Sequence, residues 1–446
     1  MREGRAGDYF LVMGREAEIV SAVRDSATFL GGTRRDHDAL LEMARDARLV
    51  LLGEPSHGSH EVYRERARIS QRLIEELGFN AVVWEADWPD AERAGRYVRD
   101  GEGAGDAEQA LAGFARFPTW MWRNTAVLEF VRWLRSRDSQ LPPARRASIY
   151  GMDLYSLYAS IRAVIDHLDR TDPAAAERAR QRYSCFDHHA GDPQAYGYAA
   201  RLGIGADCEE GAVKMLAEMQ KRVAADGEHA FSAAQNARLA RNAEAYYRSM
   251  FGSRIASWNL RDRHMAETLE GLLDFLGPDS RAIVWAHNSH LGDARATEMG
   301  EEGELNVGQL VRERFGSASL LVGFTTYDGT VTAAHEWDGP AERMRIVPAL
   351  AGSIEAIFHD VGLPRFFLPL RDPGEALGAL REPRLERAIG VIYRPGSERV
   401  SHYFNARVAD QFDAIIHLDR TRAVEPLDRI ERWSPLEPPE SFPTGI

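Results

Sequence analysis

Short apolar runs alternate along the chain with longer segments in which apolar residues recur at helical spacing. The first run spans 48–54 and precedes an amphipathic segment, about 60–77, whose spacing predicts a helix. Further apolar runs predict strands at 80–86, 147–153, 281–288, 319–326, 365–370, 388–393 and 414–418. Near-continuous apolar strands that alternate with helices are typical of a mostly parallel sheet covered on both faces. The sequence therefore predicts an α/β fold with helices flanking a central sheet.

The segment 154–280 interrupts this alternation, because it contains no strand pattern. It is rich in Ala, Arg, Glu, Gln and Met, all of which favour helices. We expect a helical insertion there that caps the carboxyl ends of the strands. The predicted organisation is an N-terminal part of the core at 1–153, the insertion, a C-terminal part of the core at 281–425 and an extended tail at 426–446.

Composition narrows the class of protein and its partners. The chain has 446 residues and a formal net charge of −13, which argues against a nucleic-acid partner because phosphate binding needs a basic surface. It has no apolar run of about 18 residues and no signal-peptide pattern, so no membrane partner is expected. Cys185 and Cys208 could pair, but two cysteines in so long a chain do not suggest a disulfide framework. A reducing compartment and a cytoplasmic location are therefore predicted.

Four of the predicted strands carry titratable side chains where they end. These side chains are Glu54, His57, Glu85, Asp153, His287 and His290. In an open parallel sheet, ligands bind beyond the carboxyl ends of the strands, and neighbouring strands lie about 4.8 Å apart. We therefore expect these groups to converge on one pocket.

Each of these residues also has a structural explanation of its own. Glu54 could cap the helix that follows it, and Glu85 could form a buried ion pair with an arginine such as Arg66. Asp153 could be the N-cap of a helix at 155–169. A single histidine in such a loop is more often structural or exposed than catalytic. Four strand ends that all carry such groups are harder to explain independently, which favours a shared site.

Missing motifs disfavour several hydrolytic chemistries. A nucleophilic serine of the α/β-hydrolase type needs G-x-S-x-G, and at 54–58 glutamate replaces the first glycine, which disfavours Ser56 as the nucleophile. Both cysteines lie in the helical insertion, and neither H-E-x-x-H nor a paired C-x-x-C occurs. What remains is a histidine flanked by carboxylates, which suits general-base activation of water. A second histidine and an arginine could stabilise the resulting oxyanion.

Five blocks of the sequence resemble the erythromycin esterase family. The longest, 51–88, contains a G-E-x-x-H-G turn, a helix that carries arginines, and a strand that ends in glutamate. The others are FPTWMWRN at 117–124, YGMDLYS at 150–156, SWNLRDRHMAETL at 257–269 and WAHNSHLG at 285–292. The resemblance spans most of the chain in the expected order and implies an α/β core with a helical excursion.

This resemblance implies hydrolysis of an ester, which in the best-known members is the macrolactone of 14-membered macrolides. The histidine that activates water in the family corresponds to His57. The other residues that the resemblance assigns to the site are Glu54, Arg66, Glu85, His287 and His290. Metal dependence differs among members of the family, so the resemblance implies no cofactor but leaves a divalent metal open.

Substrate specificity is expected in the helical insertion and in aromatic loops. Asp153 and His290 are predicted to contact the substrate, and Trp120 and Trp122, with Trp88, could line an apolar pocket for a large ring. Core packing against the sheet explains each tryptophan equally well. The expected partner is a small-molecule ester or lactone, and the oligomeric state is not predicted.

Four hypotheses follow for the function. In the leading one, metal-independent hydrolysis, His57 deprotonates water, the two glutamates orient and tune it, and Arg66 and His287 stabilise the oxyanion. A metallohydrolase could instead bind a divalent cation through His57, the two late histidines and a carboxylate. A biosynthetic acyltransferase or cyclase could reuse the site with a hydroxyl or amine acceptor. A non-catalytic binding protein is the least favoured, because an unused cluster of buried charge is costly to keep.

Overall fold

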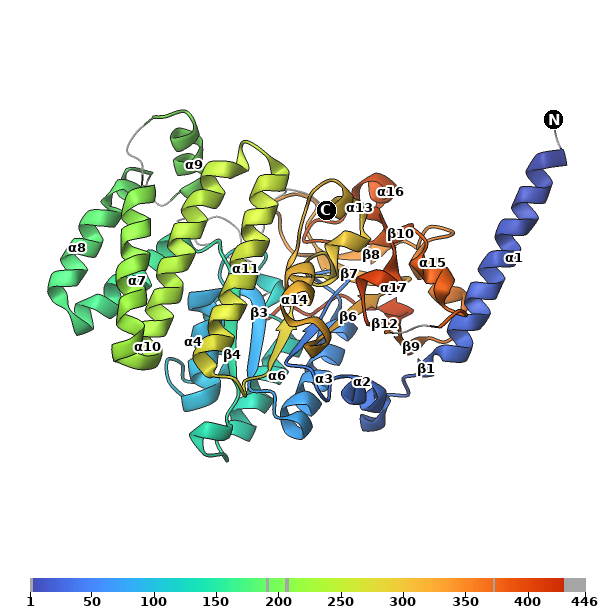
Figure 1. The fold of residues 1–446 in the computed structure, drawn as a ribbon, viewed down its shortest axis with the longest axis horizontal. Helices are drawn as coiled ribbons and strands as arrows, with labels where there is room; N and C mark the ends of the chain where they lie inside the picture. Colours follow the sequence, from blue (N-terminus) through green and yellow to red (C-terminus); the bar gives the residue numbers. More distant parts are fainter. Residues whose placement is uncertain (1–2, 190–191, 205–207, 372–373, 429–446) are drawn as a thin grey trace. The chain divides into compact units, whose positions relative to one another are not determined.

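The computed structural model describes residues 3–189, 192–204, 208–371 and 374–428 (Figure 1). The central sheet has eight strands in the order β1-β9-β12-β6-β2-β5-β3-β4, and many helices flank it. The predicted α/β class with a mostly parallel central sheet is therefore confirmed. The described residues form two compact units, one from the described parts of 3–78 and 285–425 and the other from those of 79–284 and 426–428.

The first unit holds the strands β1, β9, β12, β6 and β2 of that order. Strands β2 (Leu49–Leu52) and β12 (Ala414–Leu418) each run parallel to β6 (Ser319–Thr325), and all three are buried along their length. Strand β9 (Arg365–Pro369) runs antiparallel to β12, and β1 (Thr28–Phe29) runs antiparallel to β9. The α-helices of this unit are α1 (Glu3–Ser26), α2 (Asp38–Met43), α3 (His60–Leu77), α12 (Asn288–Leu291), α13 (Glu298–Glu301), α14 (Val307–Phe315), α15 (Ile354–Asp360), α16 (Glu398–Ser401) and α17 (Val408–Gln411).

The second unit contains the parallel pair β3 (Ala81–Asp87) and β4 (Ser148–Asp153), and both strands are buried throughout. Strand β5 (Ala282–Trp285) follows its last helix. The α-helices are α4 (Trp88–Asp100), α5 (Ala107–Ala110), α6 (Thr125–Asp138), α7 (Leu157–Thr171), α8 (Pro173–Tyr183), α9 (Pro193–Arg201), α10 (Glu209–Met250) and α11 (Arg254–Leu276). The described part of 154–280 thus contains helices and no strand, whereas the predicted domain boundaries stay a prediction.

Helix α10 is two segments joined at Gly227, whose φ of 68° and ψ of −141° are not helical. A positive φ of this kind is readily adopted only by glycine. Arg248 near one end of α10 pairs with Glu209 at the other end at 3.0 Å. The two segments therefore fold back on each other as an antiparallel hairpin.

The predicted elements match the structure closely where the chain is apolar and less well where it is mixed. The helix expected at 60–77 is α3, which ends at Leu77 before the left-handed Gly78. The prediction of a strand at 388–393 is wrong, because Ile389 and Ile392 each form only an isolated β-bridge with another segment. Six strands were missed, namely the two-residue β1, β7 (Asp328–Ala333), β8 (Glu342–Ile346), β10 (Arg384–Arg387), β11 (Tyr403–Ala406) and β13 (Arg420–Thr421). All but β1 form small sheets, and these strands have exposed or partly exposed positions, so they do not appear as apolar runs.

Cys185 and Cys208 form a disulfide bond, a pairing that the sequence left open although it did not suggest a disulfide framework. The inference of a reducing compartment loses that support, and the cytoplasmic location stays a prediction. Among the helices that the structure describes, none combines the length and apolar character needed to span a bilayer. Most of the predicted tail, from 429 onward, lies outside the described residues.

Candidate active site

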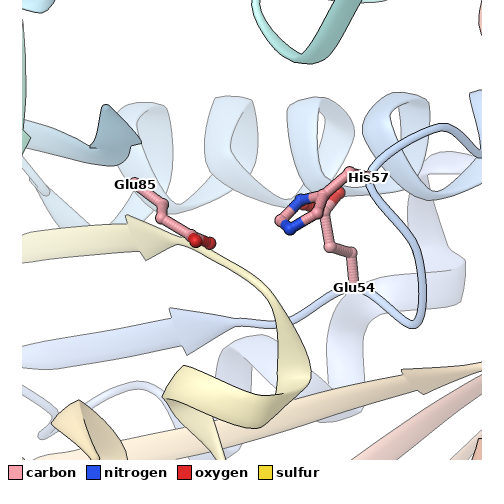
Figure 2. A group of neighbouring side chains, drawn as sticks. All are labelled: Glu54, His57 and Glu85. Atoms are coloured by element: carbon pink, nitrogen blue, oxygen red, sulfur yellow. The ribbon is translucent and has the colours of Figure 1, made fainter. Parts of the chain in front are cut away.

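The turn after β2 brings the side chains of Glu54 and His57 together (Figure 2). Gly53 starts this turn, and a Cβ there would lie 2.1 Å from the side-chain oxygen of Asn288, so only glycine fits. Glu54 is fully buried and His57 is 6% exposed. The Nδ1 atom of His57 lies 2.9 Å from Oε1 of Glu54. The turn therefore holds an imidazole against a buried carboxylate.

This contact fixes which nitrogen of His57 carries the proton. An ionised carboxylate can only accept a hydrogen bond, so Nδ1 must donate to Glu54. In the neutral ring, Nε2 then keeps its lone pair and can accept a proton. His57 is therefore arranged as a base, with Glu54 placed to stabilise the imidazolium that forms.

Arg66 holds the other oxygen of Glu54 from helix α3. Its Nη2 donates to Oε2 of Glu54 at 2.8 Å, and its guanidinium lies over the rings of Tyr63 and Trp285, at 4.3 Å and 5.0 Å from their centroids. The side chain is fully buried, and its Nε and Nη1 atoms have no hydrogen-bond partner among the described residues. Glu54 is thus an ion-pair partner rather than a helix cap, and Arg66 keeps two N–H donors for another ligand.

His287 lies just beyond β5 and has the opposite tautomer. Its Nδ1 accepts the backbone N–H of Ser289 at 3.2 Å and lies 2.9 Å from the Ser289 hydroxyl. A backbone amide can only donate, so the neutral ring carries its proton on Nε2. The ring centroids of His57 and His287 are 4.9 Å apart. A proton acceptor and a proton donor therefore lie side by side; His290 is buried nearby in the chain on α12.

Glu85 and Asp153, at the ends of β3 and β4 in the second unit, share one arginine. Arg261 of α11 donates to Glu85 Oε1 at 2.8 Å and to both oxygens of Asp153 at 2.9 Å and 2.7 Å. All three side chains are buried. Burial alone would lower the pKa of Arg261, but the Asp153 carboxylate and its neighbours hold that pKa well above its usual range. The arginine that pairs with Glu85 is therefore Arg261, and the N-cap of α7 is Ser156 instead of Asp153.

Sequence reasoning missed Arg261 and a second buried arginine of the same unit, Arg116. Arg116 donates to Asp87 and to Asp90, each at 2.7 Å, and burial raises the pKa of Asp87 to about 7 although Arg116 lowers it. A signal for Arg261 does exist: Met265 and Leu272, at helical spacing from it, are buried, so the arginine lies on an apolar helix face. An arginine at such a position needs a buried carboxylate partner.

The tryptophans predicted to line a substrate pocket are packed in the second unit. Trp120 and Trp122 are fully buried, Trp122 stacks on Trp84 with centroids 4.8 Å apart, and Trp120 packs edge-on against Phe117. Trp88 donates its indole N–H to Ser232 at 3.0 Å. The packing is that of a core, and contact of these rings with substrate stays a prediction.

Within the first unit, Glu54 and His57 offer a carboxylate and an imidazole, which are groups that could hold a metal ion (Figure 2). Carboxylate oxygen and imidazole nitrogen suit several divalent cations. However, Arg66 places a buried positive charge on Glu54, and that charge would repel a cation bound to the same carboxylate. His287 fits a ligand role poorly, because its Nε2 carries a proton and its Nδ1 accepts the Ser289 amide.

Comparisons with known proteins agree on one group of relatives. A family model described as Erythromycin esterase matches residues 74–421. The proposed hydrolase YbfO of Bacillus subtilis (strain 168) is 22% identical over 366 residues, which cover 75% of this chain and 77% of YbfO.

Three solved structures share the fold. A succinoglycan biosynthesis protein has a TM-score of 0.77 at 20% identity and covers 92% of this chain and 98% of its own. A Bacillus cereus protein has a TM-score of 0.78 at 20% identity, with coverages of 93% and 99%. A mutant of the erythromycin esterase EreC in its open conformation has a TM-score of 0.63 at 18% identity, with coverages of 86% and 93%.

Proposed function

Because the chain belongs to the erythromycin esterase family and is an esterase-like hydrolase, we propose that it cleaves a carboxylic ester or lactone with a water molecule activated by His57. The observation that carries this proposal is the buried Glu54–His57 pair, in which Nδ1 is committed to Glu54 and Nε2 is free to act as a base. General-base catalysis by such a histidine contributes about 10²- to 10⁴-fold to a rate. The substrate is a small molecule, and a macrolide is one candidate.

The proposed reaction has two steps. His57 Nε2 takes a proton from water while the water oxygen bonds to the carbonyl carbon, and the carbonyl oxygen becomes an oxyanion. We assign the Nε2–H of His287 and the unpartnered Nε and Nη1 of Arg66 as the donors to that oxyanion. The imidazolium, stabilised by Glu54, then protonates the leaving alkoxide as the C–O bond breaks. The products are a carboxylic acid and an alcohol, and His57 returns to its neutral form.

Glu85, Asp153 and His290 are assigned supporting roles. Arg261 donates to both carboxylates. We assign Glu85, which the family resemblance places in the site, to orienting the attacking water. Asp153, whose two oxygens both bind Arg261, is proposed to position Glu85, and His290 to contact the substrate.

The proposal is tested by offering the purified protein 14-membered macrolides, simpler lactones and acyclic esters, with the His57→Asn variant as the control. Loss of a macrolactone in the wild type alone would support the literal family activity. Cleavage of other esters would support the same chemistry on another substrate. If no ester is hydrolysed but acyl transfer to an added alcohol or amine is detected by mass spectrometry, the water-attack proposal is wrong.

His287 is predicted to act as a donor rather than as a base. His287→Ala should lower kcat about 10²- to 10³-fold, the usual effect of removing one oxyanion donor, with a small change in KM. His287→Gln should recover part of this loss, because a glutamine amide can also donate. Steady-state kinetics on the ester found in the screen measures both variants. A glutamine variant as impaired as the alanine variant would contradict the donor role.

A metal-dependent hydrolase is the second candidate, favoured by the adjacent carboxylate and imidazole of Glu54 and His57. We expect activity to survive dialysis against a chelator, because the charge of Arg66 opposes a cation on Glu54. Elemental analysis of the purified protein and rate measurements before and after chelation decide between the two candidates. About one divalent ion per chain, with activity lost on chelation and restored by that ion, would establish the metal-dependent alternative.

A further inference from the structure

Glu386 is a buried carboxyl group that the proposed mechanism does not use. It lies on β10, is 1% exposed, and neither of its carboxyl oxygens has a hydrogen bond of ordinary geometry among the described residues. The adjacent Arg387 does not neutralise it, because successive side chains of a strand point to opposite faces. Arg387 instead donates to Glu398 and to the carbonyl oxygens of Thr326, Tyr327 and Val347.

The groups that face Glu386 come from three other elements. Burial and the carboxyl of Glu355 on α15 raise the pKa of Glu386 to about 8, while the side-chain amides of Gln411 on α17 and Asn288 on α12 lower it. The residue opposite Glu386 on β11 is the apolar Phe404. Glu355 is itself buried, and its Oε1 accepts the backbone N–H of Arg387. No arginine or lysine is therefore among the groups that set this pKa, and the neutral acid is the favoured form near pH 7.

A proton on Glu386 would also provide a hydrogen-bond donor for a second buried side chain, that of Gln411. The side-chain oxygen of Gln411 is buried and has no donor among the described residues. A carboxylic acid supplies one O–H donor and one carbonyl acceptor, whereas a carboxylate supplies acceptors only. The neutral acid can thus donate to Gln411 and accept from the Asn288 amide.

Asn288 connects this acid to the proposed active site. Its backbone N–H donates to the carbonyl oxygen of Glu54 at 2.9 Å. Its side chain donates to the carbonyl of Phe324 at 2.7 Å and accepts the Phe324 N–H at 3.2 Å. Asn288 also directly follows His287 in the chain. Gln411 supports the far end of the same loop, where it packs closely against Gly292. A Cβ added to Gly292 would lie 2.6 Å from the Cγ of Gln411.

We propose that Glu386, as a neutral carboxylic acid, is a positioning residue that braces Asn288 and Gln411 and thereby holds His287 beside His57. This proposal rests on the proposed function for the meaning of that geometry. Ionisation of Glu386 would bury an unpaired charge and remove the donor to Gln411, which would loosen the loop 287–292. The brace is therefore intact at neutral pH and is lost as the pH rises through about 8.

The first test compares Glu386→Gln, which mimics the neutral acid, with wild type in thermal unfolding from pH 5 to pH 9. The native wild type binds a proton that the unfolded chain releases above about pH 4.3, so its stability falls until Glu386 has ionised in both states. Glutamine has no such titration. We expect equal melting temperatures at pH 5 and a higher value for Glu386→Gln at pH 9. A pH-independent difference would overturn the proposal.

A matched control is Glu398→Gln, since Glu398 is also buried but pairs with Arg387 at 3.0 Å and accepts the hydroxyl of Tyr393. Its charge is needed, so this variant should melt lower than wild type across the whole range. The control separates the loss of a carboxylate in general from the loss of an unpaired one.

The second test follows the imidazole of His287 by ¹⁵N NMR at pH 7, with the signal assigned from its absence in His287→Gln. Wild type and Glu386→Gln should show the same Nε2–H tautomer, and Glu386→Ala should lose or broaden that signal. An unaltered signal in Glu386→Ala would overturn the positioning role. Neither test requires a substrate, so a failed esterase screen would leave both results standing, and a failed brace would leave the esterase proposal intact.

Discussion

Replacement of His57 by asparagine is expected to lower kcat for ester hydrolysis about 10²- to 10⁴-fold while KM changes far less. The lost group is Nε2, the ring nitrogen of His57 that is not bonded to Glu54. Asparagine can still donate an amide N–H toward Glu54, so the buried carboxylate is not left without a donor. Steady-state kinetics on the ester identified by the screen would measure both constants.

The control for this variant is His335→Asn, because the side chain of His335 is exposed and only approaches Glu342 at 3.5 Å. It should match wild type in both kcat and KM. Equal melting temperatures of the two variants would show that His57→Asn folds normally. A His57→Asn protein that turns over at the wild-type rate would contradict the general-base mechanism outright.

The carboxyl ends of the strands were the most predictable part of this protein. The runs that became β2, β3, β4 and β5 are apolar and buried on both faces, so a polar residue at their ends stands out in the sequence. Glu54, Glu85 and Asp153 are conspicuous for this reason. What Glu85 and Asp153 bind could not be predicted, because their shared partner Arg261 comes from a helix distant in sequence.

Arg261 shows that limit most clearly. It lies 108 residues after Asp153 and 176 after Glu85, in a helix with two other arginines. Arg66 was offered as an example of an arginine that could pair with Glu85, but α3 directs Arg66 to Glu54. Likewise, tautomers depend on contacts such as the Ser289 amide on His287, which a residue pattern does not encode.

The small sheets were hidden from sequence reasoning for a different reason. Strand β8 has the sequence ERMRI, in which only Met344 and Ile346 are buried. Two buried positions are too few to define a period, so no strand was predicted there. The run 388–393 failed in the opposite sense: it is apolar and buried, yet it pairs only at single bridges and packs as part of a loop.

The buried ion pairs of the two units differ in the number of carboxylates that one arginine serves. Arg66 and Glu54 form a simple pair, whereas Arg261 serves both Glu85 and Asp153. If either Glu85 or Asp153 is replaced by a neutral residue, Arg261 still neutralises the carboxylate that remains. Removing the arginine leaves two buried carboxylates without it, which is the most costly change.

Arg261→Met should therefore be the most destabilising single substitution that the structure suggests. Methionine fills a similar volume, so the loss is electrostatic more than steric. Breaking a buried ion pair from one side typically costs about 3–5 kcal/mol, and here two carboxylates are affected. We expect a drop of at least about 3 kcal/mol in the free energy of unfolding, measured by urea denaturation at pH 7, together with loss of activity.

The matched control is Arg420→Met, which removes an arginine that also binds a carboxylate through two nitrogens, at 2.9 Å and 3.1 Å from Asp328. The side chain of Arg420 is 76% exposed, so water and salt can replace the lost pair. Its removal should cost no more than about 1 kcal/mol. Adding Asp153→Asn to Arg261→Met should recover part of the lost stability, because one of the two abandoned charges is then gone. If Arg261→Met and Arg420→Met were equally mild, the ion pairs of Arg261 could not be a main support of this end of the sheet.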